Sequence, residues 1–255
     1  MPSSPTHPTF ARSARGLCLL AFCAGLNLAG VNLASVSVAH AADAQDYSAA
    51  ERSLFMTHHL RNVSPPSTLH YRFHKGGTAE AGFDDKVAIH LEREPNGACC
   101  AGRGEFLSAE RRVVLPDIEH AEGNPVILYF LERDVRDMQR LTKGQPNHFR
   151  KRIRMAIYND ARVRDAQFDY QGQRIAGQEI TISPYLADPS RDRFEQYAGK
   201  EYVFLLSDAV PGGVFGIRTR SGPAGSTAEP LILEEMVIDG GTLPVPTANP
   251  VAKAS

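Results

Sequence analysis

The chain has 255 residues with 28 basic and 29 acidic side chains, so its formal net charge is −1. This near balance argues against a protein that binds nucleic acid, because such proteins carry excess positive charge. The length is sufficient for one sizeable hydrophobic core or two small ones.

Residues 1–41 have the pattern of a secretory signal peptide. A basic stretch with Arg12 and Arg15 and no acidic residue precedes a weakly apolar run, which ends at the small-x-small site Ala39–Ala41. A membrane anchor is the alternative, but Asn27 and Asn32 dilute the run and no basic stop follows it. We therefore expect cleavage of residues 1–41 and a product in a bacterial periplasm.

The next segments predict a helix and then a β-hairpin. Ser48 and Glu51 have the spacing of a capping box, and "SPPS" at 64–67 predicts the end of this helix. Residues 69–74 and 86–92 then alternate between apolar and polar side chains, which is typical of strands with one buried face. A third strand is expected at 104–107 or 111–115.

Two adjacent cysteines, Cys99 and Cys100, lie between turn-rich flanks, which predicts a loop. Consecutive α-carbons lie about 3.8 Å apart across a trans peptide, closer than an ordinary disulfide prefers. Free thiols are unusual in exported proteins. Three interpretations of the pair remain open: a disulfide between the two cysteines, a soft-metal site, and a loop pair without a role.

Residues 124–160 are predicted to be helical. Asn124 suits an N-cap and Pro125 the first helical position, and the run "VILYFL" is apolar nearly all round. Glu132–Arg136 and Arg133–Asp137 are spaced as i,i+4 ion pairs on the polar side. A second helix should bury its apolar positions Phe149, Ile153, Ala156 and Ile157.

Five short β-rich segments separated by turn residues follow, at 166–172, 178–186, 200–208, 213–221 and 230–239. The expected fold is α+β: a curved antiparallel sheet of about seven or eight strands with helices on one face. One domain should cover residues 42–241, and the Pro- and Ala-rich residues 242–255 should form a disordered tail.

The signal peptide, the helix before "LHYRFH", the central helices and the late strands "KEYVFLLSD" and "GVFGIRTRS" resemble the periplasmic lipoprotein-carrier superfamily of LolA and LolB. The resemblance is architectural and covers nearly all of residues 45–240. It implies an incomplete β-barrel whose N-terminal and central helices cover the concave face, and a lipid or lipoprotein acyl chain as ligand. No arginine here matches the arginine that gates the mouth of those carriers.

A carrier of this kind needs an apolar lining and a site for a headgroup. Burial of each methylene contributes about 0.8 kcal/mol, so the apolar surface of a cavity can bind a long acyl chain without polar contacts. The same apolar residues also suit a filled hydrophobic core. The expected lining is Leu69, Tyr71, Phe73, Val87, Ile89, Leu91, Ile127 and Leu131. Arg150, Lys151 and Arg154 lie in the densest basic run and are candidates for an anionic headgroup or a transient membrane contact.

A metal or redox accessory protein is the rival hypothesis. Imidazole and sulfur ligands suit copper or zinc, and the candidates are Cys99, Cys100, His70, His74 and His90. His70 and His74 are about 13 Å apart along a strand, which makes one ion shared by both difficult. A filled-core interaction protein with an envelope partner is the third possibility.

An enzyme is not favoured. The sequence contains no G-x-S-x-G or H-E-x-x-H motif, no phosphate loop and no dinucleotide fingerprint. The expectation is a protein without a cofactor that carries an apolar ligand.

Overall fold

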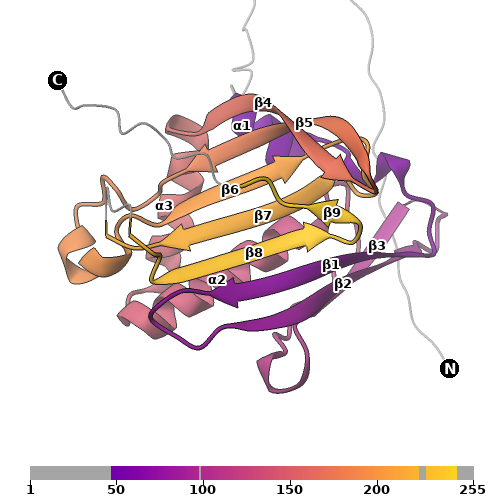
Figure 1. The fold of residues 1–255 in the computed structure, drawn as a ribbon. Helices are drawn as coiled ribbons and strands as arrows, with labels where there is room; N and C mark the ends of the chain where they lie inside the picture. Colours follow the sequence, from indigo (N-terminus) through magenta and orange to yellow (C-terminus); the bar gives the residue numbers. More distant parts are fainter. Residues whose placement is uncertain (1–46, 98, 224–227, 246–255) are drawn as a thin grey trace, which may run out of the picture. The chain divides into compact units, whose positions relative to one another are not determined.

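A nine-stranded antiparallel sheet, curved and unclosed, forms the framework of the molecule (Figure 1). The computed structural model describes residues 47–97, 99–223 and 228–245. The strand order is β3-β2-β1-β8-β7-β6-β5-β4-β9. The strands are β1 (Ser67–Gly76), β2 (Phe83–Arg93), β3 (Cys99–Phe106), β4 (Arg162–Tyr170), β5 (Gln173–Ile182), β6 (Glu201–Leu206), β7 (Val214–Ser221), β8 (Ile232–Ile238) and β9 (Gly241–Thr242). The predicted α+β class is confirmed.

The expected hairpin of the first two strands is also confirmed. β1 and β2 pair antiparallel, with Leu69 opposite Ile89 and Tyr71 opposite Val87. The apolar members of both strands are buried, because side chains alternate between the two faces of a sheet. The polar members, such as His70, lie on the other face.

The cysteine pair lies in a strand, so the expected loop is wrong. β3 begins at Cys99 and pairs with β2, while Gly102 exchanges hydrogen bonds of 2.7 and 2.9 Å with Ile118 on its other side. The main chain here pairs with β2 on one side and makes an isolated bridge to Ile118 on the other, which local turn residues do not reveal. The alternative third strand at 111–115 forms only an isolated bridge, between Val113 and Phe106.

The helices lie on one face of the sheet (Figure 1). The Ser48–Glu51 capping box is present at the start of α1 (Ala49–Glu51), but the helix is short and continues as the π-helical turn η1 (Arg52–Met56) and the 3₁₀ turn η2 (His59–Asn62). α2 (Pro125–Thr142) begins with proline, as predicted, and α3 (Pro146–Asn159) also has proline at its first position. The short 3₁₀ turns are η3 (Ala109–Arg111), η4 (Arg191–Arg193) and η5 (Glu195–Tyr197).

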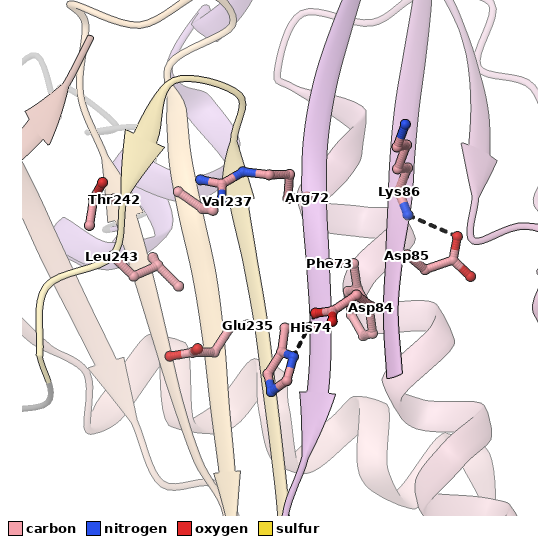
Figure 2. A pocket seen from close by; sticks show the side chains of 10 residues that line it. All are labelled: Arg72, Phe73, His74, Asp84, Asp85, Lys86, Glu235, Val237, Thr242 and Leu243. Carbon is pink, nitrogen blue, oxygen red and sulfur yellow. Dashed lines mark hydrogen bonds and ion pairs between the residues drawn. The ribbon is translucent and has the colours of Figure 1, made fainter. Parts of the chain in front are cut away.

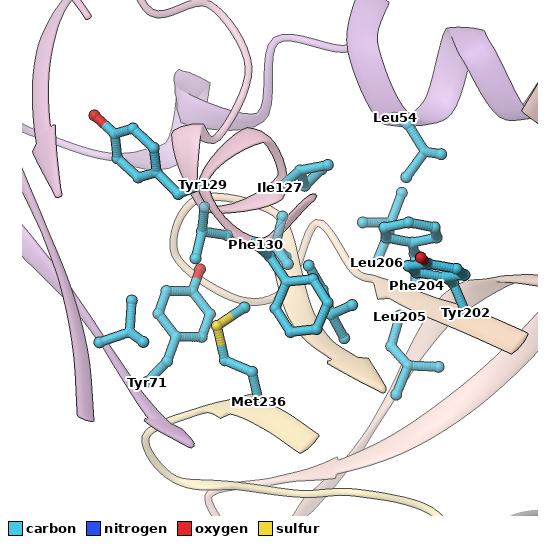
Figure 3. Close-up of a cluster of buried hydrophobic side chains, with 14 of the residues drawn as sticks. Leu54, Tyr71, Ile127, Tyr129, Phe130, Tyr202, Phe204, Leu205, Leu206 and Met236 are labelled. Atoms are coloured by element: carbon cyan, nitrogen blue, oxygen red, sulfur yellow. The ribbon is translucent and has the colours of Figure 1, made fainter. Parts of the chain in front are cut away.

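The hydrophobic core fills the space between the sheet and α2. Figure 3 shows Phe130 of α2 among side chains of the sheet, including Tyr71, Met236 and Phe204. A Cβ atom at Gly104 would lie 2.3 Å from Cε2 of Tyr129, so glycine there lets α2 approach β3 closely. The predicted buried positions of α3 are confirmed at Phe149, Ile153, Ala156 and Ile157.

Buried charged side chains lie between α2 and the sheet. One predicted ion pair, Arg133 with Asp137, is wrong. Arg133 does not form an exposed pair with Asp137; it is buried, and its Nη2 donates to Glu234 Oε1 of β8 at 2.8 Å. The helix turns this residue toward the sheet, so its partner comes from a distant strand. The Glu132–Arg136 pair is present at 3.4 Å.

The first residues of the predicted tail contact the sheet. Thr242 pairs with Asp169 of β4, Leu243 packs against the core, and the carbonyl oxygen of Pro244 accepts from Arg218, so residues 242–244 are part of the folded unit. A two-residue strand has no periodicity that a sequence pattern can show. Residues 246–255, like the predicted signal peptide at 1–41, lie outside the described residues. Within the described part, no helix has the length and apolar character needed to cross a membrane.

Candidate functional site: an apolar groove between the helices

A groove opens on the outer side of the helical layer, where η1, α2 and α3 meet. Its volume is about 430 Å³, within the rough range of 300–1,000 Å³ typical of small-molecule sites. The lining is mainly apolar and carries four charged side chains. The lining residues are Glu51, Phe55, Leu128, Leu131, Glu132, Val135, Arg150, Ile153, Arg154 and Ile157.

The floor of the groove comes from the second apolar stripe of α2. The sheet-facing stripe buries residues such as Val126 and Phe130 completely. Leu128, Leu131 and Val135 follow a spacing of three and four residues on a different side of the helix and meet Ile153 and Ile157 of α3. The all-round apolar start of α2 therefore serves two surfaces, the core and the groove.

Charged side chains form the rim. Arg150 donates from Nε and Nη2 to the two carboxylate oxygens of Glu132, at 3.0 and 2.8 Å. This bidentate pair lowers the pKa of the Glu132 carboxyl, mainly through the hydrogen bond from Arg150. The Glu51 carboxylate accepts from the backbone N–H of Ser48 at 2.9 Å.

Arg154 differs from the other charged groups of the rim. It is exposed, and within the described part of the chain no ion pair or hydrogen bond of its guanidinium is found. Both acidic groups of the groove already have partners. Arg154 is therefore the rim group best placed to meet an anion from outside the protein.

The predicted site residues divide between the core and the groove. Leu131, Arg150 and Arg154 come together in the groove, and Lys151 is exposed on α3 beside Arg150. The other predicted lining residues are at most 3% exposed and form part of the packed core beneath α2; they are Leu69, Tyr71, Phe73, Val87, Ile89, Leu91 and Ile127. Tyr129 and Phe130 of α2 belong to the same core cluster (Figure 3).

The structure does not assemble the predicted metal ligands. Cys99 and Cys100 are joined in a disulfide. His74 Nδ1 lies 2.8 Å from Asp84 Oδ1, and His90 Nδ1 lies 3.1 Å from Thr68 Oγ1. Among residues 47–97, 99–223 and 228–245, no group of three or more histidine, cysteine or acidic side chains is arranged to hold a metal ion.

A second hollow lies on the sheet face opposite the helices. Figure 2 shows His74, Asp84 and Glu235 around it, with Leu243 on the far wall. Its volume is about 640 Å³. Its lining includes acidic and basic side chains beside the apolar Phe73, Val237 and Leu243, so it is more polar than the groove.

Sequence reasoning missed several groove residues. The sequence pattern places Phe55, Leu128 and Val135 on helices but does not assign them to a ligand site, because an apolar residue on a helix suggests burial rather than a second surface. The usable signal was the apolar run at 126–131, which is too wide for one buried stripe.

Comparisons with known proteins find only distant likenesses, and these are to solved structures. No known family profile matches the sequence, and no curated protein is similar to it. The crystal structure of the Mycobacterium tuberculosis lipoprotein LppX aligns with 71% of this chain and 90% of that chain, at 10% sequence identity and a TM-score of 0.28. A likeness of this degree assigns neither a family nor a ligand.

Proposed function

We propose that the protein is a periplasmic, non-catalytic carrier or binding protein for an amphiphile with one acyl chain and an anionic headgroup. The observation that carries the proposal is the groove itself, which combines an apolar floor with the guanidinium of Arg154 at its rim, a group without a partner among the described residues. Leu128, Leu131 and Ile153 supply surface for the chain, and burial of methylenes there is favourable by about 0.8 kcal/mol each.

The charge arrangement favours an anionic over a cationic headgroup. Glu132 is held by Arg150, and Glu51 by the cap of α1. A bound carboxylate or phosphate would meet Arg154 without displacing an existing pair, and charge-assisted hydrogen bonds of this type are among the stronger ones.

Fluorescence titration with cis-parinaric acid, a fatty acid that fluoresces when bound, tests the proposal. Leu128→Asp should weaken binding roughly tenfold or more, because it removes apolar surface and repels the carboxylate. Leu128 is 52% exposed, so the fold should tolerate the change. Val114→Asp, at a residue that is 78% exposed and outside the groove lining, is the matched control.

Competition separates the two parts of the ligand. Hexadecanoic acid should displace the probe better than hexadecan-1-ol, and Arg154→Gln should remove most of that preference, while Lys86→Gln on the other sheet face should leave it unchanged. Absence of probe binding by the unmodified protein, or equal effects of Leu128→Asp and Val114→Asp, would contradict the proposal.

A further inference from the structure

The rim of the groove continues into an exposed apolar and basic surface. Phe55 and Leu128 line the groove and are also 41% and 52% exposed. Tyr158 of α3, 53% exposed, directly follows the groove residue Ile157. These large side chains expose apolar area around the mouth of the groove. A surface that faces only water usually carries polar residues instead.

α3 carries a second stripe on its exposed side. Lys151, Arg154 and Tyr158 follow a spacing of three and four residues, so they share one helix face. The buried stripe of the same helix runs through Phe149, Ile153 and Ile157. α3 is thus amphipathic, and its polar face ends in a tyrosine, a side chain suited to the boundary between water and lipid.

The charge of this helix is of one sign. α3 contains four cations, Arg150, Lys151, Arg152 and Arg154, and no acidic residue. Arg150 pairs with Glu132 and Arg152 with Asp188. In the described part of the chain, Lys151 and Arg154 have no ion-pair partner, and both are exposed. The whole chain is nearly neutral, so the excess positive charge is local.

We infer that this docking face, made of Phe55, Leu128, Lys151, Arg154 and Tyr158, binds the surface of an anionic lipid bilayer. The inference rests on the proposed function, because a water-insoluble acyl chain is best received directly from a membrane. Basic side chains are attracted to anionic headgroups, and apolar side chains enter the headgroup boundary. The groove would then open toward the bilayer.

A tryptophan reporter tests the contact directly. The chain contains no tryptophan, so Tyr158→Trp introduces a single probe on the docking face. Its emission should shift to shorter wavelength with vesicles of equal parts phosphatidylcholine and phosphatidylglycerol. Pure phosphatidylcholine vesicles should give a much smaller shift, and added salt should reduce the effect because it screens exposed charges.

Vesicle co-sedimentation of substituted proteins separates docking from ligand binding. Lys151→Gln combined with Tyr158→Ser, both outside the groove lining, should lower partitioning onto anionic vesicles by at least about tenfold, with unchanged cis-parinaric acid binding. The matched control, Lys86→Gln with Val245→Ser, lies on the opposite sheet face and should keep both properties.

Three results would overturn the inference: no partitioning of the unmodified protein, equal partitioning onto neutral and anionic vesicles, or an unaffected Lys151→Gln/Tyr158→Ser protein. If probe binding persists in any of these cases, only the membrane contact is wrong. If the unmodified protein binds neither probe nor vesicles, the proposed function has failed as well.

Discussion

His59 joins three segments of the chain through one buried imidazole. It is 4% exposed, and its Nε2 lies 2.9 Å from the carbonyl oxygen of Ser53. The backbone N–H of Asn124, the N-cap of α2, donates to Nδ1 at 3.3 Å. Because one ring nitrogen accepts and the other faces a carbonyl, the arrangement requires the neutral imidazole with its proton on Nε2.

This requirement predicts a pH-dependent stability. Burial lowers the pKa of His59, and the hydrogen bond to Ser53 opposes the shift in part. The unfolded chain therefore binds the proton more tightly, so this contribution is present above the unfolded pKa of about 6.5 and is lost as pH falls below it. His59→Gln should be less stable near pH 7.5 but should lose less stability on acidification.

Urea unfolding of the two proteins near pH 7.5 and near pH 5 measures this difference. His58→Gln, at the exposed neighbouring position, is the control and should follow the unmodified protein. If His59→Gln loses as much stability between the two pH values as the unmodified protein does, the assignment of a neutral His59 is wrong.

At the scale of elements, α2 is fixed to the sheet by a buried polar triad. Asp134 is fully buried, its Oδ1 accepts from Nζ of Lys200, and its Oδ2 accepts from the Tyr202 hydroxyl at 2.5 Å. Burial raises the pKa of Asp134, and the nearby Lys200 ammonium opposes this shift. The triad links the middle of the helix to β6, with its partners in fixed directions.

Breaking this triad on one side should be costly. Asp134→Asn leaves the Lys200 ammonium buried without its counter-charge, so the free energy of unfolding should fall by about 3–5 kcal/mol. Replacing both charges, as Asp134→Leu with Lys200→Met, should cost much less, because no uncompensated charge remains. Chemical denaturation of Asp134→Leu, Lys200→Met and the double variant measures the coupling.

An exposed pair provides the comparison. Asp208 pairs with Arg61, and their side chains are 74% and 53% exposed. Asp208→Asn should therefore change stability by less than about 1 kcal/mol. A double variant at 134 and 200 that is no more stable than Asp134→Asn would show that shape, not charge balance, fixes α2.

Local patterns predicted the elements whose periodicity is strong. Alternation gave the β1–β2 hairpin, and the cap residues gave the starts of α1 and α2. The buried partners of Arg133 and Asp134 could not be predicted, because Glu234, Lys200 and Tyr202 lie far away in the sequence, in or next to strands. The groove was anticipated only through Leu131, Arg150 and Arg154, since its remaining lining depends on how η1 and α3 pack against α2.

At the scale of the whole folded unit, a C-terminal strap of residues 239–245 connects distant strands across the sheet face opposite the helices. The strap follows β8 directly, yet β9 pairs with β4 (Figure 1). The carbonyl oxygen of Gly240 accepts from the backbone N–H of Gln171 at 2.8 Å. Arg72 and Arg218 donate to the carbonyl oxygens of Gly241 and Pro244, at 2.5 and 2.7 Å.

The strap should stabilise β4 more than the far side of the sheet. A chain that ends at Ile238 loses these hydrogen bonds and the packing of Leu243, so its free energy of unfolding should fall by roughly 2–4 kcal/mol. Hydrogen exchange should accelerate most in β4, because opening there no longer requires breaking its pairing with β9, whereas β2 should change little.

A chain that ends at Val245 keeps every contact of the strap and is the control for shortening. If the chain ending at Ile238 does not fold, Leu243→Ser tests the packing alone, and the same contrast between β4 and β2 is expected on a smaller scale. Uniform acceleration across β2 and β4 would instead mean that the strap stabilises the sheet as one cooperative unit, because local opening of β4 would then not occur without global unfolding.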